Sequence, residues 1–138
     1  MTEHSNITMV EGGIHNPAEP RHFMRIKPVA GHITICHGLD IVAESSRALR
    51  VLEVGRDIYD PVVYVPKNDV RGRIVKTEKS THCPIKGDAC YFNLIDAGDQ
   101  LVAANIAWSY TDPVEGAEDI TEFVAFYPNM TSIEEKPR

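Results

Sequence analysis

The stretch KSTHCPIKGDACY, residues 79–91, gathers reactive side chains around one proline and one glycine. The reactive residues are His82, Cys83, Lys86, Asp88 and Cys90. These residue types serve in zinc ligation, in nucleophilic catalysis by a thiolate and in anion binding at a backbone turn. The alternative to all three is a polar turn shaped by Pro84 and Gly87.

The spacing of the histidines and cysteines argues against zinc. Structural zinc sites use ligand pairs two to four residues apart, so that both ligands converge on the ion. Neither the cluster at 32–37 nor the cluster at 82–90 contains such a cysteine pair. His82 and Cys83 are adjacent and would point apart in an extended segment, and alternation places Cys90 on an apolar face. We therefore expect no metal and no cofactor.

A reactive thiol is the second interpretation, and its candidate is Cys83. His82 precedes it and Lys86 follows three residues later, and a nearby cation stabilises the nucleophilic thiolate. The alternative is a structural cysteine that packs at the entrance of a strand, next to the turn formed by Pro84 and Gly87. The sequence leaves both open.

The dipeptide Lys86-Gly87 also matches an anion-binding turn, although the spacing and the helix of a phosphate-binding P-loop are missing. Its alternative is a solvated lysine beside a turn glycine. Trp108 and Tyr110 could line a small-molecule pocket or anchor the core. Glu53 and Tyr64 belong to a preceding region of residues that, taken singly, are most often surface groups.

Composition narrows the classes of partner. The 138 residues carry a net charge of −6 and no basic run, so nucleic acid is not an expected partner. No apolar run approaches the roughly 20 residues that span a bilayer, and the first residues lack the order of a signal peptide. The three cysteines form an odd set that suits a reducing compartment, so we expect a cytoplasmic protein.

Alternation of apolar residues predicts about seven short strands and little helix. Residues 32–36 and 40–45 form an expected hairpin, and 47–54 and 62–65 are further strands, the latter followed by a turn at 66–70. Three later strands are expected at 89–94, 104–110 and 121–127. The first places Cys90, Phe92 and Leu94 on one face. The second places Ala104, Ile106, Trp108 and Tyr110 together, and the third opposes Phe123 and Ala125 to Val124 and Phe126.

These elements predict one mainly β domain, a small barrel or sandwich, over residues 23–128. Residues 1–22 have no apolar period and are expected to form an N-terminal arm. Residues 112–119 are expected to contain one helical turn after Pro113. Residues 129–138 are polar, and we expect a frayed C-terminal tail.

Five sequence blocks resemble the domain-of-unknown-function family DUF427. The blocks are V-L-E-x-G (51–55), Y-V-P-K-N-D-V (64–70), T-x-C-P-x-K-G-x-A-x-Y (81–91), A-W-S-Y-x-x-P (107–113) and V-A-F-Y (124–127). The resemblance covers residues 24–128. The matching positions are Glu53, Tyr64, Pro66, Asp69, Thr81, Cys83, Pro84, Lys86, Gly87, Tyr91, Trp108, Tyr110 and Pro113. Ile85 stands where family members commonly have an aromatic residue.

The resemblance implies a compact β-barrel of the tent type, similar to the Mss4-like architecture. The family carries a nucleotidyltransferase-like label, but this chain contains neither a paired-carboxylate metal motif nor a P-loop to support it. The two C-x-x-C knuckles of zinc-binding relatives of that architecture are absent here as well. The resemblance therefore implies a pocket without specifying a reaction.

Our leading hypothesis from the sequence is a β-barrel that binds a small, anionic molecule in a pocket lined by Tyr64, Cys83, Lys86, Trp108 and Tyr110. In it Lys86 binds the anionic group and Cys83 or Glu53 acts on it. Whether the protein is an enzyme is left open. The alternative is a non-catalytic interaction module that forms a homodimer through an exposed strand edge or apolar patch.

Overall fold

Strands make up most of the computed structural model, which describes residues 9–137. The strands are β1 (Ile14–Asn16), β2 (Glu19–Pro28), β3 (His32–His37), β4 (Asp40–Ser45), β5 (Leu49–Val54), β6 (Val62–Pro66), β7 (Arg73–Cys83), β8 (Gly87–Ile95), β9 (Leu101–Ser109), β10 (Phe123–Phe126) and β11 (Ser132–Lys136). Two short 3-10 turns, η2 (Lys67–Asp69) and η3 (Glu118–Ile120), complete the described elements. The predicted mainly β class is confirmed. Within these residues no helix has the length and apolarity needed to cross a membrane.

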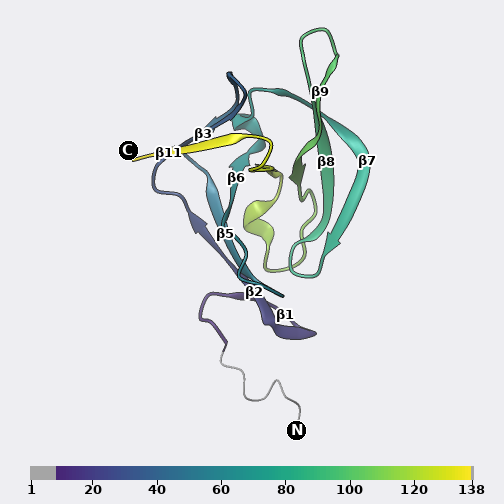
Figure 1. Ribbon diagram of the computed structural model, residues 1–138. Helices are drawn as coiled ribbons and strands as arrows, with labels where there is room; N and C mark the ends of the chain where they lie inside the picture. The colour runs from purple at the N-terminus through teal and green to yellow at the C-terminus, as the bar shows by residue number, and fades with distance from the viewer. Residues whose placement is uncertain (1–8, 138) are drawn as a thin grey trace.

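The strands form two antiparallel sheets. The larger has the order β1-β2-β5-β6-β10-β9-β8-β7, and the smaller has the order β11-β3-β4. Figure 1 shows the larger sheet bending so that β5 and β8 lie on opposite sides of η3. No ladder within residues 9–137 joins the edge strands β1 and β7. The larger sheet is therefore open, and the expected barrel of the tent type is not confirmed.

Alternation along the strands divides the interior into two cores, one on each face of the larger sheet. The first core contains Val29, Ile33, Ile35, Val42, Ala43, Ala48, Val65, Phe92, Leu94, Ala103, Ile106, Ala107, Val124 and Phe126. The second core contains Met24, Val51, Tyr64, Ile85, Ala89, Tyr91, Tyr110, Ala117, Ile120 and Ala125. The smaller sheet covers the first core, and the segment that carries η3 fills the second. Consecutive strand residues such as Tyr64 and Val65 therefore enter different cores.

The alternation predicted for β8 and β10 is confirmed, but the one predicted for β9 is wrong. Ile106 lies in the first core, whereas Trp108 packs against the second. The cause is a bulge, because the β8–β9 register shifts between Phe92 and Leu94 and Asn105 adopts a φ of 49°. The side chain of Asn93 accepts a hydrogen bond from the amide of Asn105 at 2.8 Å. Between Phe92, paired with Ala107, and Leu94, paired with Ala103, β9 takes up two extra residues. Ala103 and Ala107 keep their place in the first core, and Ile106, inside the bulge, turns into that core instead of sharing the face of Trp108.

The predicted hairpin of β3 and β4 and the strands β5 and β6 are confirmed, and two long strands were not predicted. One is β2, which crosses the expected boundary of the arm at residue 22 and pairs with β5. The other is β7, an 11-residue edge strand with mostly exposed side chains. One helical turn was expected within residues 112–119, after Pro113. The 3-10 turn η3 instead begins at Glu118, five residues after Pro113. Residues 1–8 of the expected arm lie outside the described residues.

The expectation of a frayed C-terminal tail is wrong for residues 132–136. These residues form β11, which pairs in continuous register with β3 from Ser132 opposite Cys36 to Lys136 opposite His32. All five side chains of β11 are exposed, so its polar sequence gives no apolar period. Backbone hydrogen bonds, together with an ion pair between Arg50 and Glu135, hold the strand.

Replacement of Gly31 by alanine is expected to loosen β11. A Cβ atom at Gly31 would lie 2.2 Å from the backbone oxygen of Lys136, a distance that forces the strand to move. We expect a loss of about 1–3 kcal/mol, with faster amide hydrogen exchange over 132–136. The control is Gly98→Ala, whose Cβ would meet only the side chain of Asp96, at 3.5 Å. Unchanged exchange in Gly31→Ala would contradict the docking of β11.

Candidate functional site

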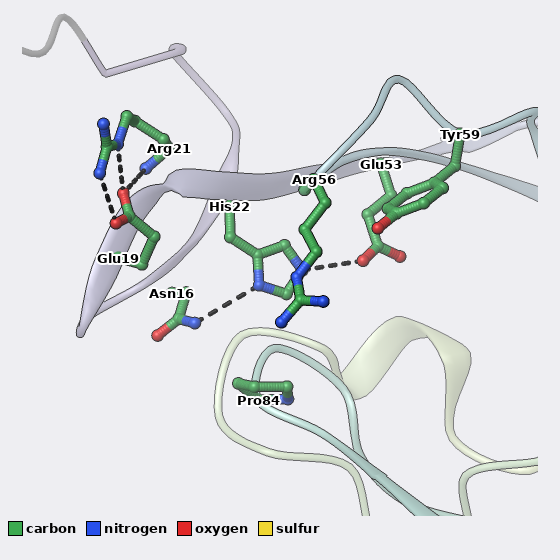
Figure 2. A pocket seen from close by; sticks show the side chains of 9 residues that line it. Asn16, Glu19, Arg21, His22, Glu53, Arg56, Tyr59 and Pro84 are labelled. Atoms are coloured by element: carbon green, nitrogen blue, oxygen red, sulfur yellow. Dashed lines mark hydrogen bonds and ion pairs between the residues drawn. The ribbon is translucent and has the colours of Figure 1, made fainter.

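An open pocket of about 640 Å³ lies where β1, β2 and β5 meet the turn after β7. Figure 2 shows the side chains that line it. The lining residues are Asn16, Glu19, Arg21, His22, Glu53, Gly55, Arg56, Tyr59 and Pro84. Most of them are polar or charged, whereas the two cores of the protein are apolar.

His22 and Glu53 form one wall of this pocket, and Lys86 bonds to Glu53 from behind it. Glu53 on β5 accepts hydrogen bonds through both carboxylate oxygens, Oε2 from His22 Nε2 at 2.8 Å and Oε1 from Lys86 Nζ. Antiparallel pairing of β2 with β5 brings His22 beside Glu53, because Phe23 faces Val54 and Met24 faces Glu53. Lys86 reaches Glu53 from the turn between β7 and β8. We call these residues the Lys86–Glu53–His22 chain.

The ion pair of Lys86 and Glu53 is largely buried, so each group depends on the other to keep its charge. The side chains of Lys86 and Glu53 are 9% and 18% exposed. Burial acts to raise the pKa of Glu53, but hydrogen bonds and charge interactions with Lys86 and His22 outweigh it and the pKa is lowered. Burial likewise opposes the charge on Lys86, but Tyr64, Glu53 and Cys83 outweigh it and raise its pKa. Both groups are therefore charged at neutral pH.

The loop after β5 supplies the other wall. Gly55 has no side chain, and a Cβ there would lie 3.0 Å from Cε2 of Tyr59 and 3.5 Å from Cδ2 of His22. The loop is held by the amide of Tyr59, which donates to the backbone oxygen of Glu53 at 3.1 Å. This close packing sets the ring of Tyr59 at the mouth of the pocket. Arg56 is exposed and, within residues 9–137, has no carboxylate partner.

The turn that carries Cys83 and Lys86 lies directly behind the pocket, and Pro84 forms part of the pocket lining. The amide of Lys86 donates to the backbone oxygen of Cys83 at 3.2 Å, which closes the turn. Gly87 adopts a φ of 116°, a conformation that residues with a Cβ rarely take. The backbone oxygen of Lys86 accepts from Val114 at 2.9 Å. The turn is thus fixed from both sides.

The structure gathers the residues predicted from the sequence around Lys86, but mostly behind the pocket wall. Cys83 is half-buried, with its sulfur 3.7 Å from Lys86 Nζ. Tyr64 and Tyr110 are buried in the second core, and burial raises the pKa of each phenol. Trp108 packs against them and donates from Nε1 to the Tyr64 hydroxyl at 3.1 Å. Of the predicted residues, Glu53 lines the pocket.

The remaining reactive residues of the stretch 79–91 lie elsewhere. His82 is exposed and bonds through Nδ1 to Asp88 at 2.8 Å. Cys90 on β8 donates to the backbone oxygen of Ser109 at 3.5 Å. Ile85 is buried in the second core. In the described part of the chain, no three histidine, cysteine or acidic side chains are grouped closely enough to hold a metal ion.

The site residues predicted from the sequence omit six charged or polar residues of the pocket: Asn16, Glu19, Arg21, His22, Arg56 and Tyr59. Asn16 and His22 fell within the expected arm, and Arg56 counted as an ordinary surface charge. Only the recognition of β2 as a strand paired with β5 could have placed His22 beside Glu53. The alternation of Met24 and Ile26 with Arg25 and Lys27 is the signal for that strand.

Residues 25–136 match the model of a family described as a domain of unknown function (DUF427). No curated protein matches the sequence. The matched range includes Glu53, Lys86 and Arg56, whereas Asn16 and His22 precede it.

Proposed function

The chain belongs to the DUF427 family, and from the geometry of its site we propose that it binds a small anionic molecule in the pocket at β2 and β5. Arg56 binds the anionic group. Glu53 and His22 form the opposite wall, with Lys86 behind them, and the ring of Tyr59 covers the ligand. The observation that carries this proposal is that the guanidinium of Arg56 has no carboxylate partner within residues 9–137, whereas the other charged groups of the pocket are paired.

The charges of the pocket support an anionic ligand. The pocket and the wall behind it hold three cations, Arg21, Arg56 and Lys86, and two carboxylates, Glu19 and Glu53. When the imidazole of His22 is neutral, this leaves a surplus of one positive charge. Glu19 pairs with Arg21 at 2.6 Å, and Glu53 pairs with Lys86. A planar guanidinium suits the bidentate binding of a carboxylate or phosphate.

This proposal changes the roles that the sequence predicted. Lys86 was expected to bind the anion, but its ammonium group is already bonded to Glu53 behind the wall. We propose that Lys86 neutralises Glu53, so that this carboxylate does not repel the ligand. Cys83 and Trp108 support the wall from the interior.

We expect Arg56→Ala to weaken anion binding by about 10- to 100-fold, because charge-assisted hydrogen bonds contribute about 1.5–3 kcal/mol. The measurement is a thermal-shift screen of nucleotides, sugar phosphates and carboxylates, followed by calorimetric titration of the best compound. A ligand at tenfold its Kd adds about 1.4 kcal/mol, which corresponds to about 5 °C of Tm in a domain of this size.

The matched control is Arg71→Gln, which removes a surface guanidinium paired with Glu44 without touching the pocket. It should leave both ligand affinity and ligand-induced stabilisation unchanged. Equal loss of affinity in both variants would indicate a general effect of net charge and would refute the assignment of Arg56. Absence of stabilisation by every anion in the screen would refute the proposed function itself.

The alternative function is a homodimeric interaction module that pairs through an exposed strand edge. The observation that favours it is β7, whose outer edge pairs with no strand in the described residues. However, β7 carries Lys76 and Lys79 and a register irregularity between Lys76 and Ser80, features that oppose edge-to-edge pairing. Sedimentation analysis over a range of concentrations tests this alternative, since a dimer that Lys76→Thr strengthens would support it.

Two further parts of the proposal concern architecture and compartment. The strong bend of the larger sheet around η3 supports the tent-type arrangement that the family resemblance implies, although hydrogen bonding does not close it. The three cysteines are all unpaired, which supports a reducing compartment such as the cytoplasm.

A further inference from the structure

We infer that the ligand of the pocket is an anion that also carries a hydroxyl group, and that Nδ1 of His22 accepts a hydrogen bond from that hydroxyl. This inference rests on the proposed function and specifies its ligand class. The class includes hydroxy acids and sugar phosphates. It follows from the bonding of the two ring nitrogens of His22.

The bond to Glu53 assigns the proton of the imidazole. An ionised carboxylate can only accept hydrogen bonds, and Lys86 holds Glu53 in that form by lowering its pKa. His22 Nε2, 2.8 Å from Glu53 Oε2, must therefore be the donor. In the neutral imidazole the other nitrogen, Nδ1, then carries a lone pair and is an acceptor.

Asn16 confirms this assignment from the other side of the ring. Its Oδ1 accepts a hydrogen bond from the amide of Ala18 at 3.0 Å, which fixes the orientation of the side-chain amide. Nδ2 of Asn16 is consequently the group that faces Nδ1 of His22, at 3.4 Å. This distance is long for a hydrogen bond. Nδ1 is thus a weakly bonded acceptor in the wall of an open pocket.

The chemistry of the ligand follows from the two groups that the pocket presents. In Figure 2 the side chain of Arg56 extends toward the space between His22 and Pro84, and all three residues line the pocket. A simple anion would bond to Arg56 and leave Nδ1 with its weak partner. An ammonium donor would be repelled by Arg56, because Glu53 is already neutralised by Lys86. A neutral hydroxyl takes the place of the Asn16 amide as the donor to Nδ1 without this repulsion.

The test compares matched pairs of ligands that differ by one hydroxyl group, by calorimetric titration: lactate against propionate, and propane-1,2-diol 1-phosphate against propyl phosphate. We expect the hydroxylated member of each pair to bind about 3- to 10-fold more tightly, the effect of a hydrogen bond of normal length in place of the long bond from Asn16. In His22→Phe, whose ring lacks an acceptor, this difference should vanish while the affinity for propionate and propyl phosphate persists. His22→Gln retains an acceptor oxygen and should restore part of the preference.

The outcomes separate this inference from the proposed function. Equal binding of both members of each pair to the wild type would overturn the inference and leave the anion site intact. A hydroxyl preference that persists in His22→Phe would overturn the role of His22. If none of the four compounds binds to the wild type, both the inference and the proposed anion site fail for these ligand classes. Circular dichroism of His22→Phe and His22→Gln verifies that both variants fold.

Discussion

Replacement of Lys86 by methionine is expected to reduce the free energy of unfolding by about 3–5 kcal/mol, the usual cost of removing one partner of a buried ion pair. Methionine fills a similar volume, so the packing of the turn is largely kept. The carboxylate of Glu53 loses the ammonium group that balances it, and burial then acts to raise its pKa. Urea denaturation of the wild type and the variant at neutral pH measures the effect.

Two further variants identify the origin of this loss. Lys67→Met removes an exposed lysine from η2 and should change stability by less than about 0.5 kcal/mol. The double variant Glu53→Gln/Lys86→Met removes both charges and should recover a large part of the loss. If the double variant loses as much stability as Glu53→Gln and Lys86→Met lose together when measured singly, the energetic coupling of Lys86 and Glu53 is refuted.

The dependence on pH gives a second measure of the same pair. Because the pKa of Glu53 is lowered from its ordinary 4.5, its contribution is present above pH 4.5 and is lost as pH falls through the folded-state pKa. The pKa of Lys86 is raised from its ordinary 10.5, so its contribution is present below pH 10.5 and is lost as pH rises through the folded-state value. The gap between wild type and Lys86→Met should therefore be widest between these two limits.

The sequence predicts those strands whose apolar side chains alternate into the cores of the protein. The alternation of β10 is such a case, because Phe123 and Ala125 enter one core and Val124 and Phe126 the other. The strands β7 and β11 escape this reasoning, because they lie at sheet edges with mostly exposed side chains. Backbone pairing determines them, and backbone pairing leaves no mark on the side-chain pattern.

The candidate site was predictable only in part, for a related reason. The turn with Cys83 and Lys86 is formed by consecutive residues, so Pro84 and Gly87 predict it within one stretch of sequence. The partner of Lys86 is 33 residues away along the chain, and only the pairing of strands brings it close. The bulge at Asn105 likewise removes Ile106 from the face that it was predicted to share with Trp108, and a single positive φ has no periodic signature.

Replacement of Trp108 by alanine is expected to reduce stability by about 3–5 kcal/mol, the range for truncating a packed aromatic side chain. The indole contacts the ring of Tyr64 edge-on, with centroids 6.2 Å apart, and the ring of Tyr127 at 4.6 Å. The truncation also leaves the buried hydroxyl of Tyr64 without its donor. For a domain of this size, such a loss of stability should lower the midpoint of thermal unfolding, Tm, by more than about 10 °C.

The comparison variant is Tyr59→Ala, which removes a half-exposed aromatic ring from the mouth of the pocket. Tyr59→Ala should cost little stability and should weaken anion binding, because the ring covers the ligand. Trp108→Ala, measured at a temperature where it is folded, should bind the anion with an affinity close to that of the wild type. If Trp108→Ala instead keeps its stability and loses the ligand, the indole is part of the binding surface. The site would then lie within the second core, where the sequence first placed it, and the pocket at β2 and β5 would not be the binding site.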